Sequence, residues 1–421
     1  MEASEELFDV CVVGAGAAGL WAAERAAREG ARVLLLEKTP RTGTKVLASG
    51  GTRCNLTTTL EPEEALPWFG PVGARFLTEA VWNLPPSAIR IRFEQLGVPS
   101  VEAPLEKVFP ESGRARDVRD ALERAVREAG VHVELNHGVA HPSREDSTWR
   151  LRAQGGVSWT ARRLVLATGG RSYPSTGTTG DGYTWLRDLG LPIVEPVPAL
   201  VPLRSQAAWV HALTGIALQD VEGSVVSPRG RRLECRRRPI LFTHEGLSGP
   251  CAMDLSGRIA RGLARGERGW SLSLDLLPEL EREQLRERIV AGAGARGAPR
   301  LSEAVGLSLP KRVWSALGEL LGDGPDPRCG ELSKEARHAW IEHLKGVPIP
   351  VSGTLGFDKA EVTGGGLDLR VVDPPTCRVR GVPDLWVCGE LLDLQGPIGG
   401  FSFLAAWATA ELAGASAATG C

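Results

Sequence analysis

Three glycines near the N-terminus have the spacing of a loop that can bind a pyrophosphate. Gly14, Gly16 and Gly19 follow the apolar run 7–13, which is typical of a buried strand. Gly14 permits a tight turn, Gly16 lets the backbone approach an anion, and Gly19 lets the next helix pack closely on the sheet. The free N–H groups at the start of that helix favour a negative charge. The spacing therefore predicts a dinucleotide site.

An acidic residue closes the next apolar run, 33–36. Glu37 lies about 20 residues beyond the glycines, where a carboxylate can accept both hydroxyls of a ribose. A second stretch with the same glycine spacing, 292–297, follows a charged helical run, 278–288, and has Pro299 soon after it. Because no apolar strand precedes this stretch and no helix begins behind it, we expect a loop there.

Two more segments have the composition of a cofactor site. Residues 48–55 contain two adjacent glycines and short polar side chains, with Lys45 and Arg53 as flanking cations. Such a segment can fold over phosphates or a flavin ring, and a surface loop is the alternative. The apolar run 164–166 ends in small residues, as expected where a strand of a parallel sheet stops beneath a ligand.

The C-terminal segment contains a helix that begins with glycines. Residues 396–403 contain Gly396, Gly399 and Gly400, and the helix is expected to continue through Leu412. The positive end of such a helix can stabilise the negative charge of a reduced flavin. A helix that only packs on the core is the alternative.

Composition narrows the class of protein. The chain has 421 residues, of which 43% are hydrophobic, and a formal net charge of −2. This balance argues against a nucleic-acid partner. No basic leader opens the chain and no apolar run is long enough to span a bilayer, so we expect a cytoplasmic protein without a membrane partner. The eight cysteines are scattered, as in reduced proteins, and predict no metal site.

Six arginines crowd the segment 229–238, at positions 229, 231, 232, 236, 237 and 238. They could contact RNA or another polyanion, but no aromatic residues are interleaved with them. Arginine also outnumbers lysine throughout the chain. A solvated hairpin is therefore the favoured interpretation.

The residue composition of the chain changes twice along the sequence, which predicts an inserted domain. Residues 1–190 and 351–421 are rich in glycine loops and apolar runs, and we assign them to the two parts of one cofactor-binding domain. Residues 191–350 open with four prolines and short strand-like pieces. We expect this insert to be β-rich over 191–277 and helical over 278–346.

Several of these segments together resemble the HI0933-like family of flavoproteins, which includes BaiN-type and aminoacetone oxidase-type enzymes. The matching segments are VVGAGAAGL (12–20), SGGTRCNLT (49–57), ATGG (167–170), STGTTGDGY (175–183), ILFTHEGLSGP (240–250), VTGGG (362–366) and VCGELLDLQGPIGGFSF (387–403). The resemblance implies an α/β fold, with a split Rossmann-type FAD-binding domain and an inserted β-barrel-like domain that carries a helical portion.

By motif position, the resemblance also implies which residues contact FAD. They are Gly14, Ala15, Gly16, Ala18, Gly19, Glu37, Lys38, Lys45, Ser49, Gly50, Gly51, Arg53, Cys54, Asn55, Val133, Ala167, Thr168, Gly169, Gly389, Glu390, Gly399, Gly400 and Phe401. The first five would hold the pyrophosphate and Glu37 the ribose. Val133 would lie on the adenine side, and the residues from Ala167 onward would approach the flavin.

The catalytic group is less well defined than the cofactor. His244 is the candidate acid or base, because the resemblance places its loop over the flavin and an imidazole titrates near neutral pH. A structural histidine is the alternative. Cys54 lacks a second cysteine nearby, so we expect it to pack rather than to relay electrons.

Three functions remain open at this point. The leading one is an FAD-dependent oxidoreductase that uses NADH or NADPH as a transient donor to reduce a small apolar or unsaturated molecule. The second is an FAD-dependent oxidase of a small amine or ketone. The third is a flavin-dependent RNA-modifying protein. The sequence leaves the substrate and the oligomeric state open.

Overall fold

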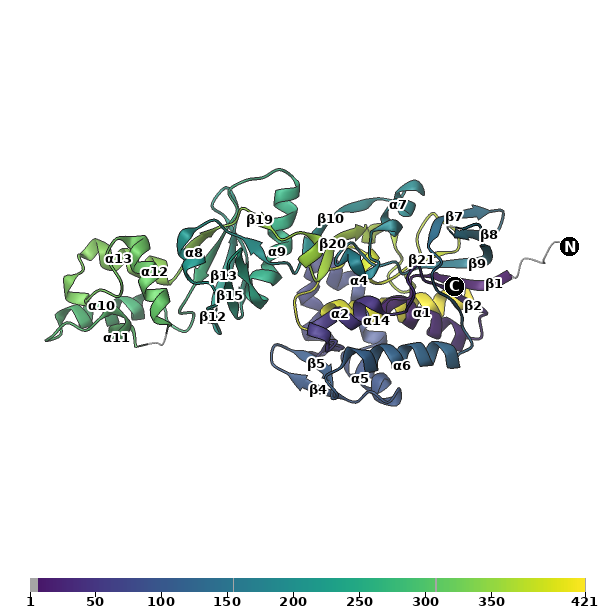
Figure 1. Ribbon diagram of the computed structural model, residues 1–421, viewed down its shortest axis with the longest axis horizontal. Coiled ribbons are helices and arrows are strands. Elements are labelled where there is room, and N and C mark those ends of the chain that lie inside the picture. Colours follow the sequence, from purple (N-terminus) through teal and green to yellow (C-terminus); the bar gives the residue numbers. More distant parts are fainter. Residues whose placement is uncertain (1–6, 154, 307–308, 421) are drawn as a thin grey trace. The chain divides into compact units, whose positions relative to one another are not determined.

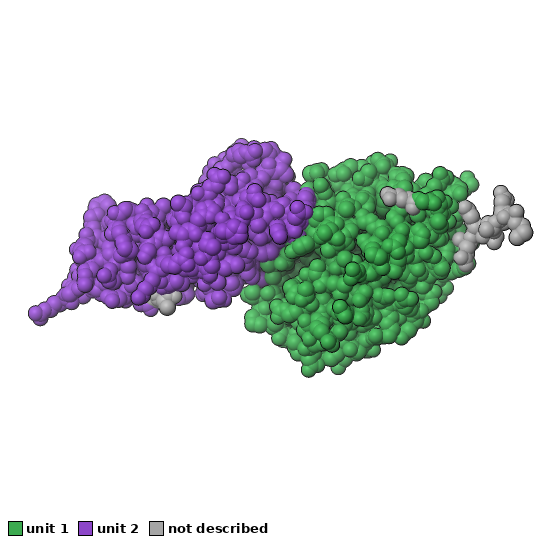
Figure 2. Space-filling model, viewed as in Figure 1, with its two compact units in different colours: residues 1–196, 361–421 green, residues 197–360 purple. Residues whose placement is uncertain are grey.

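The computed structural model describes residues 7–153, 155–306 and 309–420. The chain forms two compact units (Figure 2). Unit 1 combines residues 1–196 and 361–421, and unit 2 is residues 197–360. Unit 2 is therefore an insertion within unit 1, with boundaries at 196/197 and 360/361 rather than at 190/191 and 350/351.

A mixed sheet forms the core of unit 1. Its strands lie in the order β6, β2, β1, β9, β8 and β7, and β21 pairs with the second half of β9. The contacts among β6, β2, β1, β9 and β21 are parallel, whereas β7 and β8 are antiparallel. The bounds are β1 (Leu7–Val13), β2 (Val33–Leu36), β6 (His132–Glu134), β7 (Val139–Glu145), β8 (Thr148–Ala153), β9 (Ser158–Leu166) and β21 (Leu385–Val387).

Helices cover this sheet, and α1 and α14 pack against it as a pair (Figure 1). The helices of unit 1 are α1 (Ala17–Arg28), α2 (Thr44–Ala48), α3 (Pro62–Ala65), α4 (Gly70–Asn83), α5 (Pro86–Gln95), α6 (Ala115–Glu128), α7 (Asp181–Asp188) and α14 (Phe401–Thr419). A small antiparallel sheet contains β3 (Thr57–Thr58), β4 (Ser100–Ala103) and β5 (Lys107–Pro110). Near the connections to unit 2, β10 (Ile193–Ala199) pairs with β20 (Val362–Leu367).

The two helices of the α1/α14 pair run parallel. The rings of Trp21 and Trp407 lie 5.3 Å apart, and one turn further along α1 the Arg25 Nε atom lies 2.6 Å from Glu411 Oε1. The partner positions on α14 thus advance as α1 advances. Since α1 begins where β1 ends, the positive ends of both helices point to the carboxyl edge of the sheet.

Helix α14 is longer than expected, because it continues past Leu412 to Thr419. A glycine near the end of a helical segment often marks the C-terminus of the helix, and Gly414 has this position in the sequence. In the structure this glycine lets the helices approach, since a Cβ there would lie 2.5 Å from the Ala22 carbonyl oxygen.

Unit 2 has two sheets and a helical part. The two sheets lie at one end of the unit and the helical part at the other (Figure 1). One sheet contains β11 (Leu203–Arg204), β12 (Ala217–Leu218), β15 (Ile240–Thr243), β16 (Gly246–Ser248) and β19 (Gly353–Thr354). The other contains β13 (Glu222–Val226), β14 (Arg232–Arg237), β17 (Ser271–Asp275) and β18 (Val347–Pro350). The helices are α8 (Ala208–Ala212), α9 (Gly249–Ala264), α10 (Arg282–Gly294), α11 (Leu301–Val305), α12 (Lys311–Leu321) and α13 (Lys334–Leu344).

Two expectations for unit 2 need correction. Residues 292–297 are not all loop, because Gly292 and Gly294 belong to the last turn of α10. The arginine segment does form a hairpin, β13–β14, but it is not solvated throughout. The Arg238 side chain is only 5% exposed and lies 3.5 Å from the buried Asp254 carboxylate. Within the described ranges, no helix is long and apolar enough to cross a membrane.

Candidate functional site

Two glycines shape the turn between β1 and α1, because the surrounding backbone leaves no room for a side chain at either position. Gly14 has a φ of +102°, and a Cβ there would lie 2.6 Å from the Ala167 carbonyl oxygen. A Cβ at Gly19 would lie 1.7 Å from the carbonyl oxygen of Gly14. Both positions therefore need glycine for backbone packing. They fix how α1 leaves the sheet.

Gly16 is different, because nothing inside the protein requires a glycine there. Its φ of −78° suits any residue, and a Cβ would meet no atom within 4 Å. Gly16 is the N-cap of α1, and the first turn has neither a side-chain cap nor an acidic residue. Open space thus lies in front of free N–H donors at a positive helix end. This cradle fits a pyrophosphate.

Glu37 lies at the end of β2, beside the glycine turn. Its Oε2 atom accepts a hydrogen bond of 2.8 Å from the Ala15 N–H, and Oε1 accepts one of 2.9 Å from the Thr39 N–H. Val133 is in register with Leu35 on the neighbouring strand, so it also lies near this end of the sheet. A ribose held by Glu37 would therefore place its base toward β6.

Strand register brings the other small-residue segments to the same edge. Leu166, the last residue of β9, is paired with Val13 on one side and with Val387 on the other. The residues that follow Val13, Leu166 and Val387 in the chain are Gly14, Ala167 and Cys388. Gly389 then packs against α1, since a Cβ there would lie 2.7 Å from the Ala18 Cβ. Segments far apart in sequence thus converge at one site.

A polar network joins Lys45 to Glu390. The Lys45 Nζ atom lies 2.6 Å from Glu390 Oε2 and donates to Ser172 Oγ at 2.6 Å. The second oxygen, Oε1, accepts from the Ser172 hydroxyl at 3.0 Å and from the Thr363 N–H at 2.7 Å. Both charged side chains are about three-quarters buried. The structure therefore brings two expected residues together and adds two that sequence reasoning missed.

Thr168 has a buried hydroxyl without a partner among the described residues. Gly182 packs on it, since a Cβ there would lie 2.3 Å from Thr168 Oγ1. The neighbouring Tyr183 donates its hydroxyl to the Glu390 carbonyl oxygen at 3.2 Å, and burial raises the pKa of this phenol. An unsatisfied buried hydroxyl at the carboxyl edge is a second feature that fits a polar ligand.

The segment 49–55 forms a tight turn that two of its side chains fasten to β5. Gly50 and Gly51 have φ values of +55° and +65°. Arg53 places its guanidinium 4.2 Å from the centre of the Phe109 ring, and the Asn55 side chain accepts from the Val108 N–H at 2.9 Å. Ser49 instead donates its hydroxyl to the Val46 carbonyl oxygen in the preceding helix, α2.

Cys54 is fully buried in the same turn. Burial raises the pKa of its thiol to about 12, so the thiolate is scarce near neutral pH. This protonated state agrees with a packing role for Cys54 and argues against a thiol relay.

Helix α14 begins on two glycines with positive φ, Gly399 at +136° and Gly400 at +88°. A Cβ at Gly400 would lie 2.2 Å from the Thr57 backbone. The first turn of α14 has neither a side-chain cap nor an acidic residue. The Phe401 side chain is buried beside Phe69, with ring centres 5.8 Å apart. Only its backbone is therefore available to a ligand.

Lys38 and His244 are two further expected residues. Lys38 pairs with Asp181, at 2.7 Å between Nζ and Oδ2, and this pair joins the end of β2 to the start of α7. His244 lies in the turn between β15 and β16, in unit 2, and is exposed. Within unit 2 the structure gives it no role in packing.

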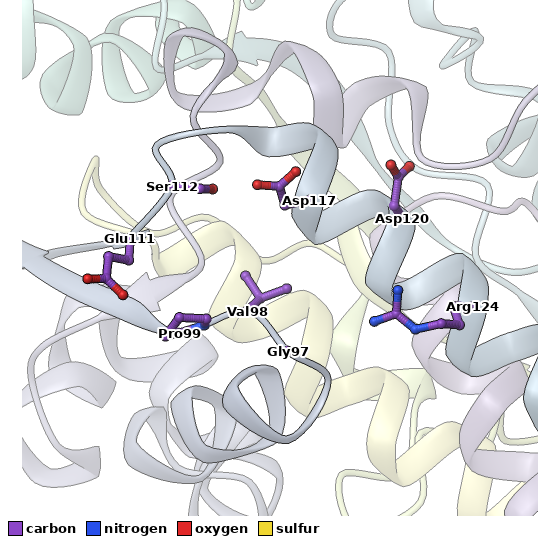
Figure 3. A pocket seen from close by; sticks show the side chains of 8 residues that line it. All are labelled: Gly97, Val98, Pro99, Glu111, Ser112, Asp117, Asp120 and Arg124. Atoms are coloured by element: carbon purple, nitrogen blue, oxygen red, sulfur yellow. The ribbon is translucent and has the colours of Figure 1, made fainter.

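A pocket of about 560 Å³ lies elsewhere in unit 1 (Figure 3). Its side chains come from the α5–β4 connection, from the β5–α6 connection and from α6: Gly97, Val98, Pro99, Glu111, Ser112, Asp117, Asp120 and Arg124. The Ser112 hydroxyl bonds to the Asp117 carboxylate and holds its pKa below the usual range. None of the residues expected to bind a cofactor lines this pocket. In the described parts of the chain, no cluster of His, Cys, Asp or Glu could hold a metal ion.

Comparisons with known proteins found related sequences over most of the chain. The HI0933-like protein Rossmann domain matches residues 8–416. The chain is 30% identical over 407 residues to the ribosomal RNA dihydrouridine synthase of Escherichia coli K12, covering 96% of each chain. It is also 30% identical to the 3-dehydro-bile acid delta(4,6)-reductase of Clostridium scindens, covering 97% of this chain and 98% of the relative.

Among solved structures, a 3-ketosteroid-delta4-(5alpha)-dehydrogenase from Rhodococcus jostii RHA1 has a similar fold. The TM-score is 0.51 at 18% sequence identity, covering 99% of this chain and 98% of the other. The family match confirms the resemblance and the α/β fold expected from the sequence. The chain therefore belongs to the HI0933-like family, a group of FAD-dependent oxidoreductases with a Rossmann-type fold.

Proposed function

We propose that this protein reduces a carbon–carbon double bond conjugated to a carbonyl group, with NADH or NADPH as the electron source. Substrate, nicotinamide donor and one proton are consumed, and the saturated product and oxidised nicotinamide are released. Bound FAD supplies the hydride chemistry. The convergence at the carboxyl edge of β2, β1, β9 and β21 is the observation that carries the proposal.

The residues at this edge divide into regions that match the parts of FAD. The Gly16 cradle at the start of α1 suits the pyrophosphate, and Glu37 suits the ribose. Glu37 already accepts the Ala15 N–H, so its carboxylate is oriented without a ligand. An oriented carboxylate loses less entropy on binding than a free one.

The network of Lys45, Ser172, Thr363 and Glu390 has a positioning role in this proposal. Three donors hold the Glu390 carboxylate, which fixes the backbone at Gly389 and Glu390. That backbone lies against α14, because Gly389 donates its N–H to the Thr409 hydroxyl, in the middle of this helix, at 3.0 Å. We assign the flavin ring to the N-terminal end of α14, where the positive end of the helix stabilises negative charge on the ring.

The class of substrate is supported by what the names of the two relatives share. Dihydrouridine is uridine whose ring double bond, conjugated to a carbonyl, has been reduced. A 3-dehydro-bile acid delta(4,6)-reductase acts on double bonds conjugated to a 3-keto group. The relatives differ in the size of the substrate, so this proposal covers both an RNA base and a small enone. The sequence-based expectation that nucleic acid takes no part lacks support from these relatives.

An anaerobic experiment tests the proposal. The purified holoprotein is titrated with NADPH and then NADH while the flavin absorption is followed. The bleached protein is then mixed with an unsaturated 3-ketosteroid or with an unmodified ribosomal RNA. We expect one donor to bleach the flavin, and one acceptor to restore its colour and to gain two hydrogens by mass spectrometry.

Other outcomes would contradict the proposal. A flavin that neither nicotinamide reduces would exclude the proposed electron source. Rapid reoxidation in air with a full yield of peroxide, without reduction of either acceptor, would indicate an oxidase. The variant Lys45→Met tests the positioning role of the network. We expect this variant to retain FAD but to turn over the acceptor more slowly.

A further inference from the structure

The six arginines of segment 229–238 fall into two groups in the structure. One group has four members that bond within unit 2. Three of them lie near a carboxylate: Arg236 at 2.7 Å from Glu234, Arg237 at 2.7 Å from Asp220 and Arg238 at 3.5 Å from Asp254. Arg232 donates to Ser273 across the sheet at 3.0 Å. These four side chains therefore serve the fold of unit 2.

Arg229 and Arg231 belong to the other group. They lie in the turn 227–231 that joins β13 to β14, and both are exposed. The turn is ordered by the Ser227 N–H, which donates to the Arg231 carbonyl at 2.9 Å, and by the Gly230 N–H, which donates to the Ser227 carbonyl at 2.8 Å. Neither guanidinium has a carboxylate partner among the residues that the structure describes.

A second segment brings two more arginines to the same end of the sheet. Val226 is paired with Ser271, so the residues after β13 lie beside the residues before β17. A Cβ at Gly269 would lie 3.7 Å from the Pro228 Cβ, which confirms that the two turns are in contact. Arg265 at the end of α9 and Arg268 in the following turn are both exposed. In the described chain neither side chain has an ion-pair partner.

We propose that these four side chains bind the phosphate backbone of RNA. We call Arg229, Arg231, Arg265 and Arg268 the basic edge. They place four cations on two adjacent turns, and Glu267 is the acid that lies between them in sequence. Guanidinium groups without internal partners are available to phosphates. The concentration of charge is local, because the whole chain carries a net charge of −2.

The inference rests on the proposed function and selects its RNA branch. One relative that matches 96% of this chain is named a ribosomal RNA dihydrouridine synthase. An enzyme that reduces a base within a large RNA needs contacts to the backbone, because those contacts position the nucleic acid. The basic edge supplies such contacts from unit 2.

The test compares two sets of variants that change charge equally. The first is the quadruple variant Arg229→Gln, Arg231→Gln, Arg265→Gln and Arg268→Gln. The control set combines the four substitutions Arg204→Gln, Arg237→Gln, Arg282→Gln and Arg286→Gln, at side chains that are also about half exposed but pair with carboxylates. Binding to a fluorescent ribosomal RNA fragment is measured by anisotropy at several salt concentrations. Flavin content and thermal unfolding verify the fold of each variant.

We expect wild-type protein to bind RNA with a strong salt dependence. The quadruple variant should bind at least ~10-fold more weakly at low salt, and the slope of log K against log salt should fall by about 1 per arginine. The control variants should keep the wild-type slope. RNA binding equal in the quadruple variant and in wild type would overturn the basic edge. So would wild-type protein that binds vesicles of anionic phospholipid but not RNA.

This assay separates the surface from the chemistry. RNA binding that depends on the basic edge, in a protein that reduces no acceptor, would keep the surface and reject the proposed reaction. Reduction of ribosomal RNA at wild-type affinity by the quadruple variant would keep the reaction and reject the surface.

Discussion

Two segments of this chain have the same glycine spacing, and the structure uses them in different ways. In residues 14–19, two glycines make backbone contacts that no other residue permits, and Gly16 faces open space at a helix N-terminus. In residues 292–297, Gly292 and Gly294 end a helix instead. A Cβ at Gly292 would lie 2.9 Å from the Ala304 Cβ and 3.1 Å from Cys329 Sγ, so this glycine serves helix packing. The spacing has a meaning only with its flanking strand and helix.

The largest expected effect is at Gly19. Gly19→Ala places a Cβ 1.7 Å from the Gly14 carbonyl oxygen, so the turn and the helix must separate. We expect a loss of about 3 kcal/mol in the free energy of unfolding and no bound FAD. Chemical denaturation and the flavin absorption of the purified protein measure the two effects. Wild-type stability with a full complement of FAD would contradict the close packing.

The next effect separates binding from folding. Gly16→Val adds a side chain where the structure has space, at a φ that valine adopts readily. The apoprotein should lose only about 1 kcal/mol, the cost of a poor N-cap. FAD affinity should fall by ~10-fold to ~100-fold, because the side chain occupies the proposed pyrophosphate position. Unchanged affinity in a calorimetric titration would exclude this cradle as the anion site.

A smaller effect is expected at Glu37. Glu37→Gln keeps an oxygen that can accept the Ala15 N–H but removes the charge that would strengthen bonds to ribose hydroxyls. The dissociation constant for FAD should rise by about 10-fold, with thermal unfolding of the apoprotein nearly unchanged. Thr39→Ala is a matched control, since it keeps the backbone N–H that Glu37 also accepts.

The smallest effect tests the second segment. Gly294→Ala adds a Cβ that meets no atom within 4 Å and replaces a poor helix former. We expect a gain of about 0.5 kcal/mol in stability and no change in FAD affinity. Gly297→Ala should instead cost about 1 kcal/mol, because Gly297 has a φ of +89°. A loss of FAD in either variant would contradict the assignment of residues 292–297 to packing.

The parallel strands and their glycine exits could be predicted from the sequence because their signals are local. An apolar run followed by small residues identifies β1 and β9 without knowledge of their partners. Gly292 was wrongly expected in a loop, because its packing partners lie in segments that no local pattern connects to it. The end of α14 was missed for the same reason, since the close approach of Ala22 explains Gly414.

The polar network could be predicted only in part. Lys45 and Glu390 belong to segments that resemble the family, but the sequence gives no sign that they pair across 345 positions. Ser172 lies in a loop and Thr363 near the start of β20, and only the fold brings them to Glu390. The arginine segment could also be predicted only in part. Four of its six arginines bond within unit 2 and two have no carboxylate partner among the described residues, so composition alone could not separate the structural side chains from the available ones.

The α1/α14 pair also sets the order in which the molecule can be completed during synthesis. Trp21 and Arg25 on α1 both bond to Glu411, which is synthesised after the whole of unit 2. Unit 2 is continuous and can fold earlier. The first segment of unit 1 must therefore wait for the last one, and its exposed apolar surface is at risk of aggregation during that interval. In the proposed FAD site, which includes the start of α14, loading of the dinucleotide follows the completion of unit 1 for the same reason.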